Sequence, residues 1–175
     1  MYSNSVSVES GLIDCYAWDT VVNWMESKNS GIALDSTNYG NYMNSSITLT
    51  NVLYRIYIHD SINGKWISFP VKYKKGDLNI LPRVQGGEST FYEIATGSTE
   101  KIKVLNIYDM AGNMWEWTTE VGNHNAGASA TQYAVARGGG LDGYGDKYPV
   151  SSCSGNVRSE GCSYDIGFRV VLYVK

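Results

Sequence analysis

The sequence predicts an α+β fold with one or two helices, short irregular sheets and much loop. Three observations support this prediction. One amphipathic helix pattern lies near the N-terminus, at residues 16–26. Strand-like alternation is confined to short runs such as residues 52–59. Glycine- and serine-rich stretches without a hydrophobic period lie between the patterned segments, most clearly at residues 138–165. Helical and strand patterns that do not alternate regularly favour the α+β class.

The chain length fits one domain. A chain of 175 residues can bury most of a single hydrophobic core, and 43% of its residues are hydrophobic while 18% are charged. No repeat or linker divides it. We therefore expect a single domain over residues 1–175, and the polar start at residues 1–5 suggests the C-terminal part of a longer protein.

The charge and hydropathy patterns exclude two classes of partner. The formal net charge is −3, and the longest basic run is Lys72-Tyr73-Lys74-Lys75, which is too short to neutralise a series of phosphates. No apolar stretch is long enough to span a bilayer, and no signal-peptide pattern opens the chain. We expect no nucleic-acid partner and no membrane insertion.

The N-terminal third is predicted to hold an edge strand or frayed end at residues 1–10, a helix, and a loop at residues 30–46. Asp14 is a suitable N-cap for the helix at residues 16–26. The positions that form one helical face, at spacings of three and four, are Trp18, Val21, Val22 and Met25.

The middle of the chain predicts a hairpin. Residues 52–59 alternate between two faces, residues 66–73 form a second β-like run, and Asn63-Gly64 between them is a strong turn signal. The apolar face of the first run comprises Val52, Tyr54, Ile56 and Ile58. Residues 76–100 are mostly irregular, with a turn at Gly86-Gly87, and short strands are expected at residues 133–137 and 168–174.

The most specific motif is NIYDMAGNMWEW at residues 106–117. Gly112 and Asn113 tolerate left-handed backbone, so they predict a tight bend. Trp115 and Trp117 then lie on one face of a strand, with the intervening residue on the other.

Glu116, the residue between the tryptophans, has two open interpretations. A carboxylate beside a bend with outward-turned carbonyls is a candidate calcium site, because calcium takes carboxylate and backbone oxygens. The alternative is an ion pair with Arg137 or Arg169.

The motif is followed by Arg-Gly-Gly at residues 137–139 and Gly-Phe-Arg at residues 167–169. Together they resemble the formylglycine-generating-enzyme (sulfatase-modifying factor) branch of the C-type-lectin-like fold, closely over residues 100–175 and less closely over residues 11–27. The resemblance implies a core strand at residues 108–117 and structural arginines. It implies no required cofactor and a candidate structural calcium site. The implied calcium ligands are the carbonyls of Ala111, Gly112 and Met114 and the carboxylate of Glu116.

The resemblance argues against catalysis. Oxidases of this branch hold copper with two cysteines five positions apart, and thiolates suit that metal. Here Cys153 lies near the second position, but Tyr148 lies five residues before it, and Cys162 follows nine residues later. The iron-dependent relatives need three histidines, and this chain has two, His59 and His124. We expect no enzyme; the alternative is a copper-dependent formylglycine-generating oxidase acting on a peptide cysteine.

A second resemblance concerns the variable proteins of diversity-generating retroelements, which occur in phages and bacteria. Adenine-directed mutagenesis of their AAC-like codons yields a restricted residue set, and from residue 141 to residue 165 only Lys147 and Glu160 fall outside it. The unpaired-looking cysteines fit random products, although a Cys153–Cys162 disulfide is not excluded. A chain with 14 Tyr and 19 Gly also resembles adaptable binding surfaces.

These observations predict a ligand- or receptor-binding domain with a variable C-terminal face, on a phage virion or a bacterial cell surface. The ligand is expected to be a protein or cell-surface component; the oligomeric state is not indicated. A structural cap on a fibre is a further alternative and would lack exposed aromatic residues there. The candidate contact residues are Leu141, Asp142, Tyr144, Asp146, Tyr148, Ser151, Ser152, Cys153, Ser154, Asn156 and Tyr164.

Overall fold

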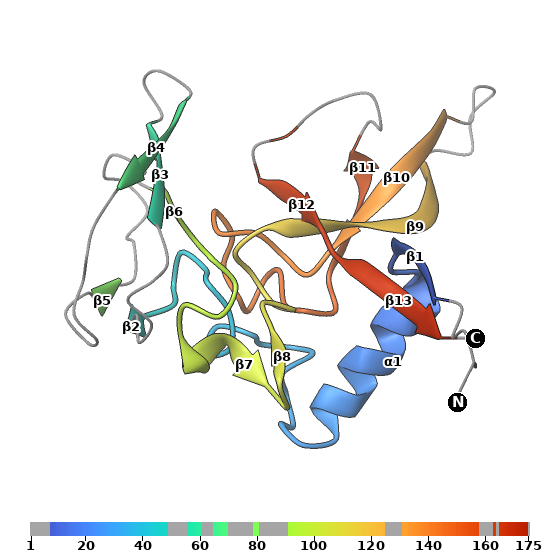
Figure 1. Ribbon diagram of the computed structural model, residues 1–175, viewed down its shortest axis with the longest axis horizontal. Helices are drawn as coiled ribbons and strands as arrows, with labels where there is room; N and C mark the ends of the chain where they lie inside the picture. Colours follow the sequence, from blue (N-terminus) through green and yellow to red (C-terminus); the bar gives the residue numbers. More distant parts are fainter. Residues whose placement is uncertain are drawn as a thin grey trace, which may run out of the picture.

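The computed structural model describes residues 8–48, 56–60, 65–69, 79–80, 91–124, 131–157, 163 and 165–174. It has an α+β architecture in which one α-helix lies at one side of a set of short strands and connecting segments (Figure 1). In chain order the elements are β1 (Val8–Leu12), α1 (Cys15–Glu26), β2 (Ile47–Thr48), β3 (Ile56–Asp60), β4 (Lys65–Phe69), β5 (Asn79–Ile80), β6 (Phe91–Ile94), the 3-10 helix η1 (Glu100–Ile102), β7 (Lys103–Val104), β8 (Ile107–Tyr108), β9 (Trp115–His124), β10 (Thr131–Arg137), β11 (Cys153–Val157), β12 (Ile166–Phe168) and β13 (Val170–Val174).

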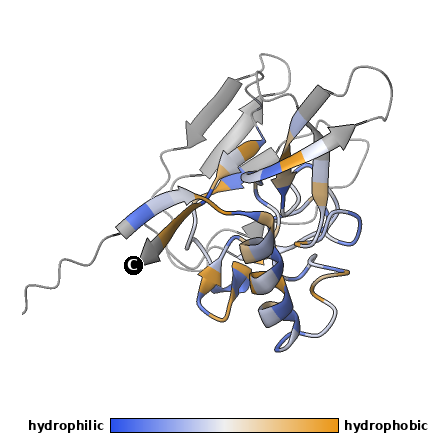
Figure 2. Ribbon diagram, turned by 90° about the vertical axis from the view of Figure 1, so that its right-hand side faces the viewer, coloured by the Kyte–Doolittle hydropathy of each residue, from blue (hydrophilic) through white to orange (hydrophobic). Residues whose placement is uncertain are grey.

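The predicted helix is confirmed with its cap. The backbone N–H of Ala17 donates to the Asp14 carboxylate at 2.7 Å, so the cap satisfies one of the free amides of the first turn. Trp18, Val22 and Met25 are buried on the predicted face. Figure 2 shows hydrophilic and hydrophobic residues interleaved along α1, as expected for a helix with one buried side. The described residues contain no helix long and apolar enough to cross a membrane.

The first and last strands pair with each other. β1 and β13 are antiparallel, with Val8 opposite Val174 and Leu12 opposite Val170. The N-terminal edge strand is thus confirmed from Val8 onward. The strand expected at residues 168–174 is confirmed over residues 170–174, which form β13. Phe168 is instead the last residue of β12, and the two strands join different sheets.

The largest sheet has the order β11-β10-β9-β12. β10 contains the strand predicted at residues 133–137, and β12 runs parallel to β9 (Figure 1). The prediction of an unbroken loop at residues 138–165 is wrong, because residues 153–157 form β11 against β10. The core strand implied for residues 108–117 is also corrected: β8 ends at Tyr108 and β9 begins at Trp115, with a bend between them.

The central hairpin is confirmed in its pairing. β3 and β4 are antiparallel, and β6 pairs on the other side of β3, within a region that the sequence had predicted to be irregular. The β2–β5 and β7–β8 pairs complete the sheets of the described residues. Several predicted features lie outside the described residues: Val52 and Tyr54, the Asn63-Gly64 turn, the run at residues 72–75 and the Gly86-Gly87 turn.

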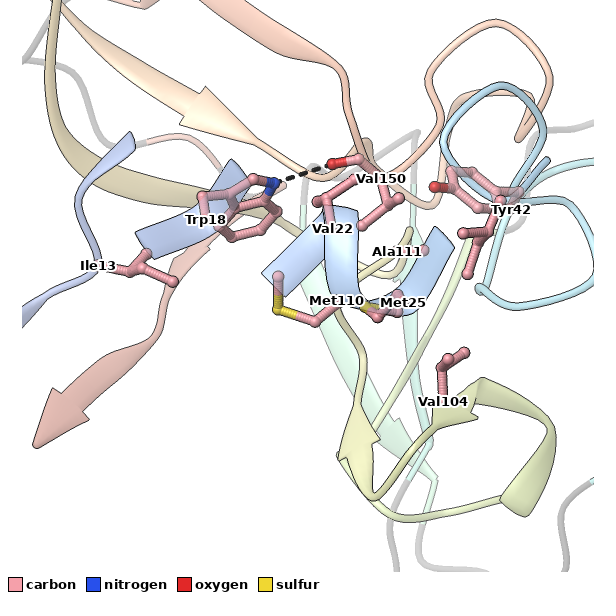
Figure 3. Packing of buried hydrophobic residues seen from close by; sticks show 10 residues of the cluster. Ile13, Trp18, Val22, Met25, Tyr42, Val104, Met110, Ala111 and Val150 are labelled. Atoms are coloured by element: carbon pink, nitrogen blue, oxygen red, sulfur yellow. Dashed lines mark hydrogen bonds between the residues drawn. The ribbon is translucent and has the colours of Figure 1, made fainter. Parts of the chain in front are cut away.

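The hydrophobic core lies between α1 and the bend that precedes β9. Trp18 is fully buried, and its indole N–H donates to the carbonyl of Val150 at 3.0 Å (Figure 3). Met110 and Ala111, from the bend, pack in the same cluster. The cluster therefore joins the N-terminal helix to the C-terminal half of the chain, which carries the predicted site. Its members are Ile13, Trp18, Val22, Met25, Ile32, Tyr42, Val104, Met110, Ala111 and Val150.

Candidate functional site

The bend between β8 and β9 is confirmed. Gly112 and Asn113 have φ values of 66° and 64°, as their residue types predict, and Asp109 is also left-handed at 54°. The buried Asn113 amide donates to the Ile94 carbonyl at 2.9 Å, and its oxygen accepts the Ile94 N–H at 3.1 Å. The bend is therefore tied to β6, 19 residues earlier in the chain.

Glu116 forms an ion pair with Arg169. The guanidinium Nε and Nη2 donate to its two carboxylate oxygens at 2.9 and 2.7 Å. Nη2 also donates to the carbonyls of Tyr108 and Asp109, at 3.1 and 3.0 Å. Burial raises the pKa of Glu116, and Arg169 opposes this shift. Of the two arginines that the sequence left open, Arg169 is the partner.

Arg137 instead joins the sheet to α1. Its Nε and Nη2 donate to Glu120 at 2.9 and 2.6 Å, and its Nη1 donates to Asp19 at 3.2 Å. Asp19 is largely exposed, so the second contact contributes little. Both arginines have the structural role that the resemblance implied.

A cavity of about 160 Å³ opens beside the bend. Three of the four implied calcium ligands line it, namely Gly112, Met114 and Glu116. Ala111 does not: its carbonyl oxygen lies within 2.4 Å of where a Cβ on Gly40 would be. Asp109, which was not among the predicted calcium ligands, also lines the cavity.

The Asp109 carboxylate is buried without a hydrogen-bond partner. Its side chain is 5% exposed, and neither carboxylate oxygen has a hydrogen-bond partner. Burial raises its pKa to about 6, against lowering contributions from nearby Thr96 and Arg169. The Thr96 hydroxyl lies close enough to affect this pKa but does not form a hydrogen bond of acceptable geometry. Its position in the motif, beside the bend, was the sequence signal that could have identified it.

These residues fit a hard cation better than a soft one. Asp109 supplies an unpartnered carboxylate at a cavity that Gly112 and Met114 also line, and calcium prefers carboxylate and backbone oxygens. Glu116 lines the same cavity, but both of its carboxylate oxygens accept from Arg169. Within the described residues, no three side chains of His, Cys, Asp or Glu converge as a metal cluster. Backbone oxygens would therefore supply part of any calcium coordination.

A second cavity, of about 340 Å³, lies at the start of β9 and β12. Trp115 and Ile166, opposite each other in the parallel β9–β12 pair, form one side. Tyr148 faces Trp115 edge-on, with ring centroids 5.9 Å apart and planes at 69°. The residues that line it are Trp115, Asp142, Gly143, Tyr148, Ser154, Asp165 and Ile166.

The segment that carries Tyr148 is anchored. The N–H groups of Ser36 and Met43 donate to the carbonyls of Gly145 and Gly143, at 3.0 and 2.8 Å. The Val150 N–H donates to the Ser36 hydroxyl at 2.9 Å. Residues 141–150 are thus held against the segment at residues 36–44, and the cavity has a fixed wall.

The predicted contact residues are only partly brought together. Asp142, Tyr148 and Ser154 line the cavity. Leu141 is fully buried, so its prediction as a contact residue is wrong; its side chain is part of the interior. The lining residues of this second cavity that were not predicted as contact residues are Trp115, Gly143, Asp165 and Ile166.

The remaining candidates lie outside this cavity. The Asp146 carboxylate accepts from Asn44 at 3.2 Å, and the Ser151 hydroxyl donates to the Ala33 carbonyl at 2.5 Å. Tyr144 lies under Lys147, whose Nζ is 5.0 Å from the ring centroid. Ser152 is partly buried. Tyr164 and the side chain of Asn156 lie outside the described residues.

Cys153 is an exposed free thiol at the start of β11. Cys162, its candidate partner, lies outside the described residues. His59 and His124 occupy β3 and the end of β9, and their side chains are likewise not described. Tyr148, at the position of the missing cysteine, is 46% exposed at the cavity.

Comparison with known proteins identifies a family. The model of the sulfatase-modifying factor enzyme 1-like domain matches residues 66–174, more than half of the chain and the part that contains both cavities. No curated protein and no solved structure matches the chain significantly.

Proposed function

The chain belongs to the sulfatase-modifying factor enzyme 1-like domain family, and we propose that it is a non-catalytic member that binds a protein or cell-surface ligand. The observation that carries this proposal is the open cavity between Trp115 and Tyr148. Aromatic side chains at a recess are typical anchors of binding interfaces. A scaffold of short sheets that presents such a recess also agrees with the C-type-lectin-like fold, which is part of this proposal.

Residue chemistry disfavours catalysis by this chain. A two-thiolate copper site needs a second cysteine five residues before Cys153, and Tyr148 lies there. A phenol is a poor replacement for a soft thiolate ligand. The oxidase alternative requires a tight copper site, and this chain lacks the second thiolate ligand for one.

Copper binding separates the two alternatives. Titration of the reduced domain with Cu(I) in competition with a chelator should show no tight stoichiometric site. Tight one-to-one binding that is lost in Cys153→Ser, together with formylglycine formation on a cysteine peptide, would establish the oxidase instead.

We further propose that the face around Tyr148 is diversified by a retroelement, on a phage virion or a bacterial cell surface. Sequencing the gene and its downstream DNA tests this directly. A near-repeat of the codons for residues 138–170 that differs only at adenines, beside a reverse transcriptase gene, is the expected result. Its absence would leave a binding domain of fixed specificity.

Calcium binding at the first cavity is part of the same proposal. Asp109 would hold the ion, with backbone oxygens of Gly112 and Met114, at the bend that leads into Trp115. Glu116 would join them only by exchanging a hydrogen bond from Arg169 for the ion. Calcium would neutralise buried negative charge there and stabilise the start of β9. It would have no chemical role in ligand binding.

Ligand binding itself can be tested without a known ligand. A displayed library of random 12-residue peptides is selected on the intact domain, and the winners are measured against Tyr148→Ala. Tyr16→Ala is the matched control, because Tyr16 is an exposed tyrosine on α1 and does not line the cavity. Binding should fall at least about tenfold in the first variant and stay unchanged in the second. Winners insensitive to Tyr148→Ala, or no winners at all, would contradict the proposal.

A further inference from the structure

The Gly-Phe-Arg motif presents its aromatic residue to solvent. Phe168 ends β12 and is 68% exposed, whereas the arginine after it turns inward to Glu116. Further along the chain, Val170 and Leu172 of β13 are 53% and 64% exposed. The residue between them, Val171, packs against the core. Exposed side chains therefore alternate with inward ones, and Phe168, Val170 and Leu172 form an apolar row on the outer side of the chain.

The apolar row begins beside the second cavity. In the parallel β9–β12 pair, Trp115 lies opposite Ile166, and both line this cavity. The next pair on the same face is the half-buried Trp117 with Phe168, because side chains two positions apart on a strand project to the same side. The step along each strand is about 7 Å. Phe168 thus follows the cavity directly on one face of the sheet, and β12 continues into β13, which carries the rest of the row (Figure 1).

A protein ligand that reaches this cavity needs more contact surface than the cavity offers. Seven residues of the described chain line the cavity, whereas a stable protein–protein interface takes about 20–30 residues and about 800 Å² from each partner. The interface must therefore extend over neighbouring surface. Apolar and aromatic side chains form the buried centre of such interfaces. The apolar row supplies them within one step along the strand.

We propose that the apolar row is part of the ligand interface, and that the protein ligand covers it with apolar side chains while another of its side chains enters the second cavity. Apolar groups of the ligand suit the row because polar groups placed there would lose water without gaining hydrogen bonds. The inference rests on the proposed binding function and specifies the surface that the ligand covers and the chemistry of the ligand's own contact surface.

The test uses the peptides selected on the intact domain. An extended peptide of 12 residues spans about 40 Å, which is far enough to reach from the cavity across the row. The tightest peptide that depends on Tyr148 is measured by isothermal titration calorimetry on wild type, Phe168→Ser and Leu172→Ser. Leu34→Ser is the matched control, because Leu34 is 79% exposed in the turn at residues 31–34 and lines neither cavity. Circular dichroism spectra and melting temperatures report the folding of each variant.

Phe168→Ser should weaken peptide binding by about tenfold or more, and Leu172→Ser by about threefold or more, because each removes apolar surface that the ligand had covered. Leu34→Ser should bind as wild type does. The heat capacity of binding should be less negative for Phe168→Ser than for wild type, since less apolar surface is buried. An alanine scan of the peptide should find one apolar position whose effect disappears in Tyr148→Ala and another whose effect disappears in Phe168→Ser.

The contrary results are distinguishable. Peptides that depend on Tyr148 and bind Phe168→Ser and Leu172→Ser as tightly as wild type would overturn this inference and leave the binding function intact. An equal loss in Leu34→Ser would overturn it as well. So would a dimer, detected by light scattering, that is lost in Phe168→Ser while peptide affinity is unchanged, because a second copy then covers the row.

Failure of the binding function gives a different result. If no peptide depends on Tyr148, the binding function at this face fails, and the inference fails with it. The alanine scan on the wild-type domain decides even if a variant misfolds, because a peptide with a single sensitive apolar position would overturn the inference.

Discussion

Replacing Arg169 with methionine tests the buried ion pair that holds the motif bend. Methionine keeps most of the aliphatic volume and removes the guanidinium. Glu116 then loses both of its charged donors, and the carbonyls of Tyr108 and Asp109 lose theirs. The carboxylate remains largely buried, so little water can replace the lost partners.

The expected cost is about 3 kcal/mol in the free energy of unfolding. Removing one partner of a buried pair costs about 3–5 kcal/mol, because the other charge is left uncompensated. Arg169 is partly exposed, which places the value at the lower end of that range. Removing both charges, in Glu116→Gln/Arg169→Met, should restore much of the loss, since no buried charge then remains.

Equilibrium urea unfolding at pH 7 in the presence of EDTA measures these differences. The deficit of Arg169→Met should shrink at acidic pH, because burial already raises the pKa of Glu116 and protonation removes its charge. A single-variant loss under about 1 kcal/mol would refute the reasoning. So would a double variant that is less stable than Arg169→Met.

Three further predictions concern other parts of the chain. The Glu26 carboxylate accepts two backbone N–H groups beyond the end of α1, which lowers its pKa. Wild type should therefore have a higher urea midpoint than Glu26→Gln, and this difference should be full above pH 4.5, the ordinary pKa of the carboxyl. The difference should disappear as pH falls through the lower pKa of Glu26 in the folded state. A difference in midpoint that does not depend on pH would contradict this prediction. Gly139→Ala should lower the free energy of unfolding in urea by about 2 kcal/mol or more and should weaken peptide binding. The reason is that φ of Gly139 is +77° and the added Cβ would lie 2.2 Å from the Tyr148 carbonyl oxygen. A variant as stable as wild type would show that the backbone shifts without cost. Calcium at a hundredfold excess over its Kd should raise the melting temperature of wild type by about 5–10 °C and that of Asp109→Asn by less, measured by calorimetry; equal shifts would remove Asp109 from the site.

Local chemistry made several elements predictable. The helix follows from an apolar spacing and one capping carboxylate, all within a dozen residues, so no distant contact is needed to specify it. The bend at Gly112 and Asn113 follows from residues that tolerate left-handed backbone. The antiparallel hairpin of β3 and β4 likewise depends on neighbours in sequence.

The cavity chemistry depended on distant contacts. Trp115 was predicted as part of a strand, but its place beside Ile166 results from parallel pairing between segments about fifty residues apart. Leu141 was predicted at the surface because it lies in a polar segment; its N–H bonds to the Asn113 carbonyl and its side chain is buried there. Neither relation leaves a local pattern in the chain.

By itself, the sequence determined the α+β class, the helix with its cap, the bend and the motifs that identify the family. Only the tertiary structure decided that Arg169 rather than Arg137 neutralises Glu116, that Asp109 is left without a hydrogen-bond partner, and which residues share a cavity. The physical reason is the distance along the chain over which each interaction acts. Backbone preferences and capping act over a few residues, whereas ion pairing and burial depend on which distant segments the folded core brings together.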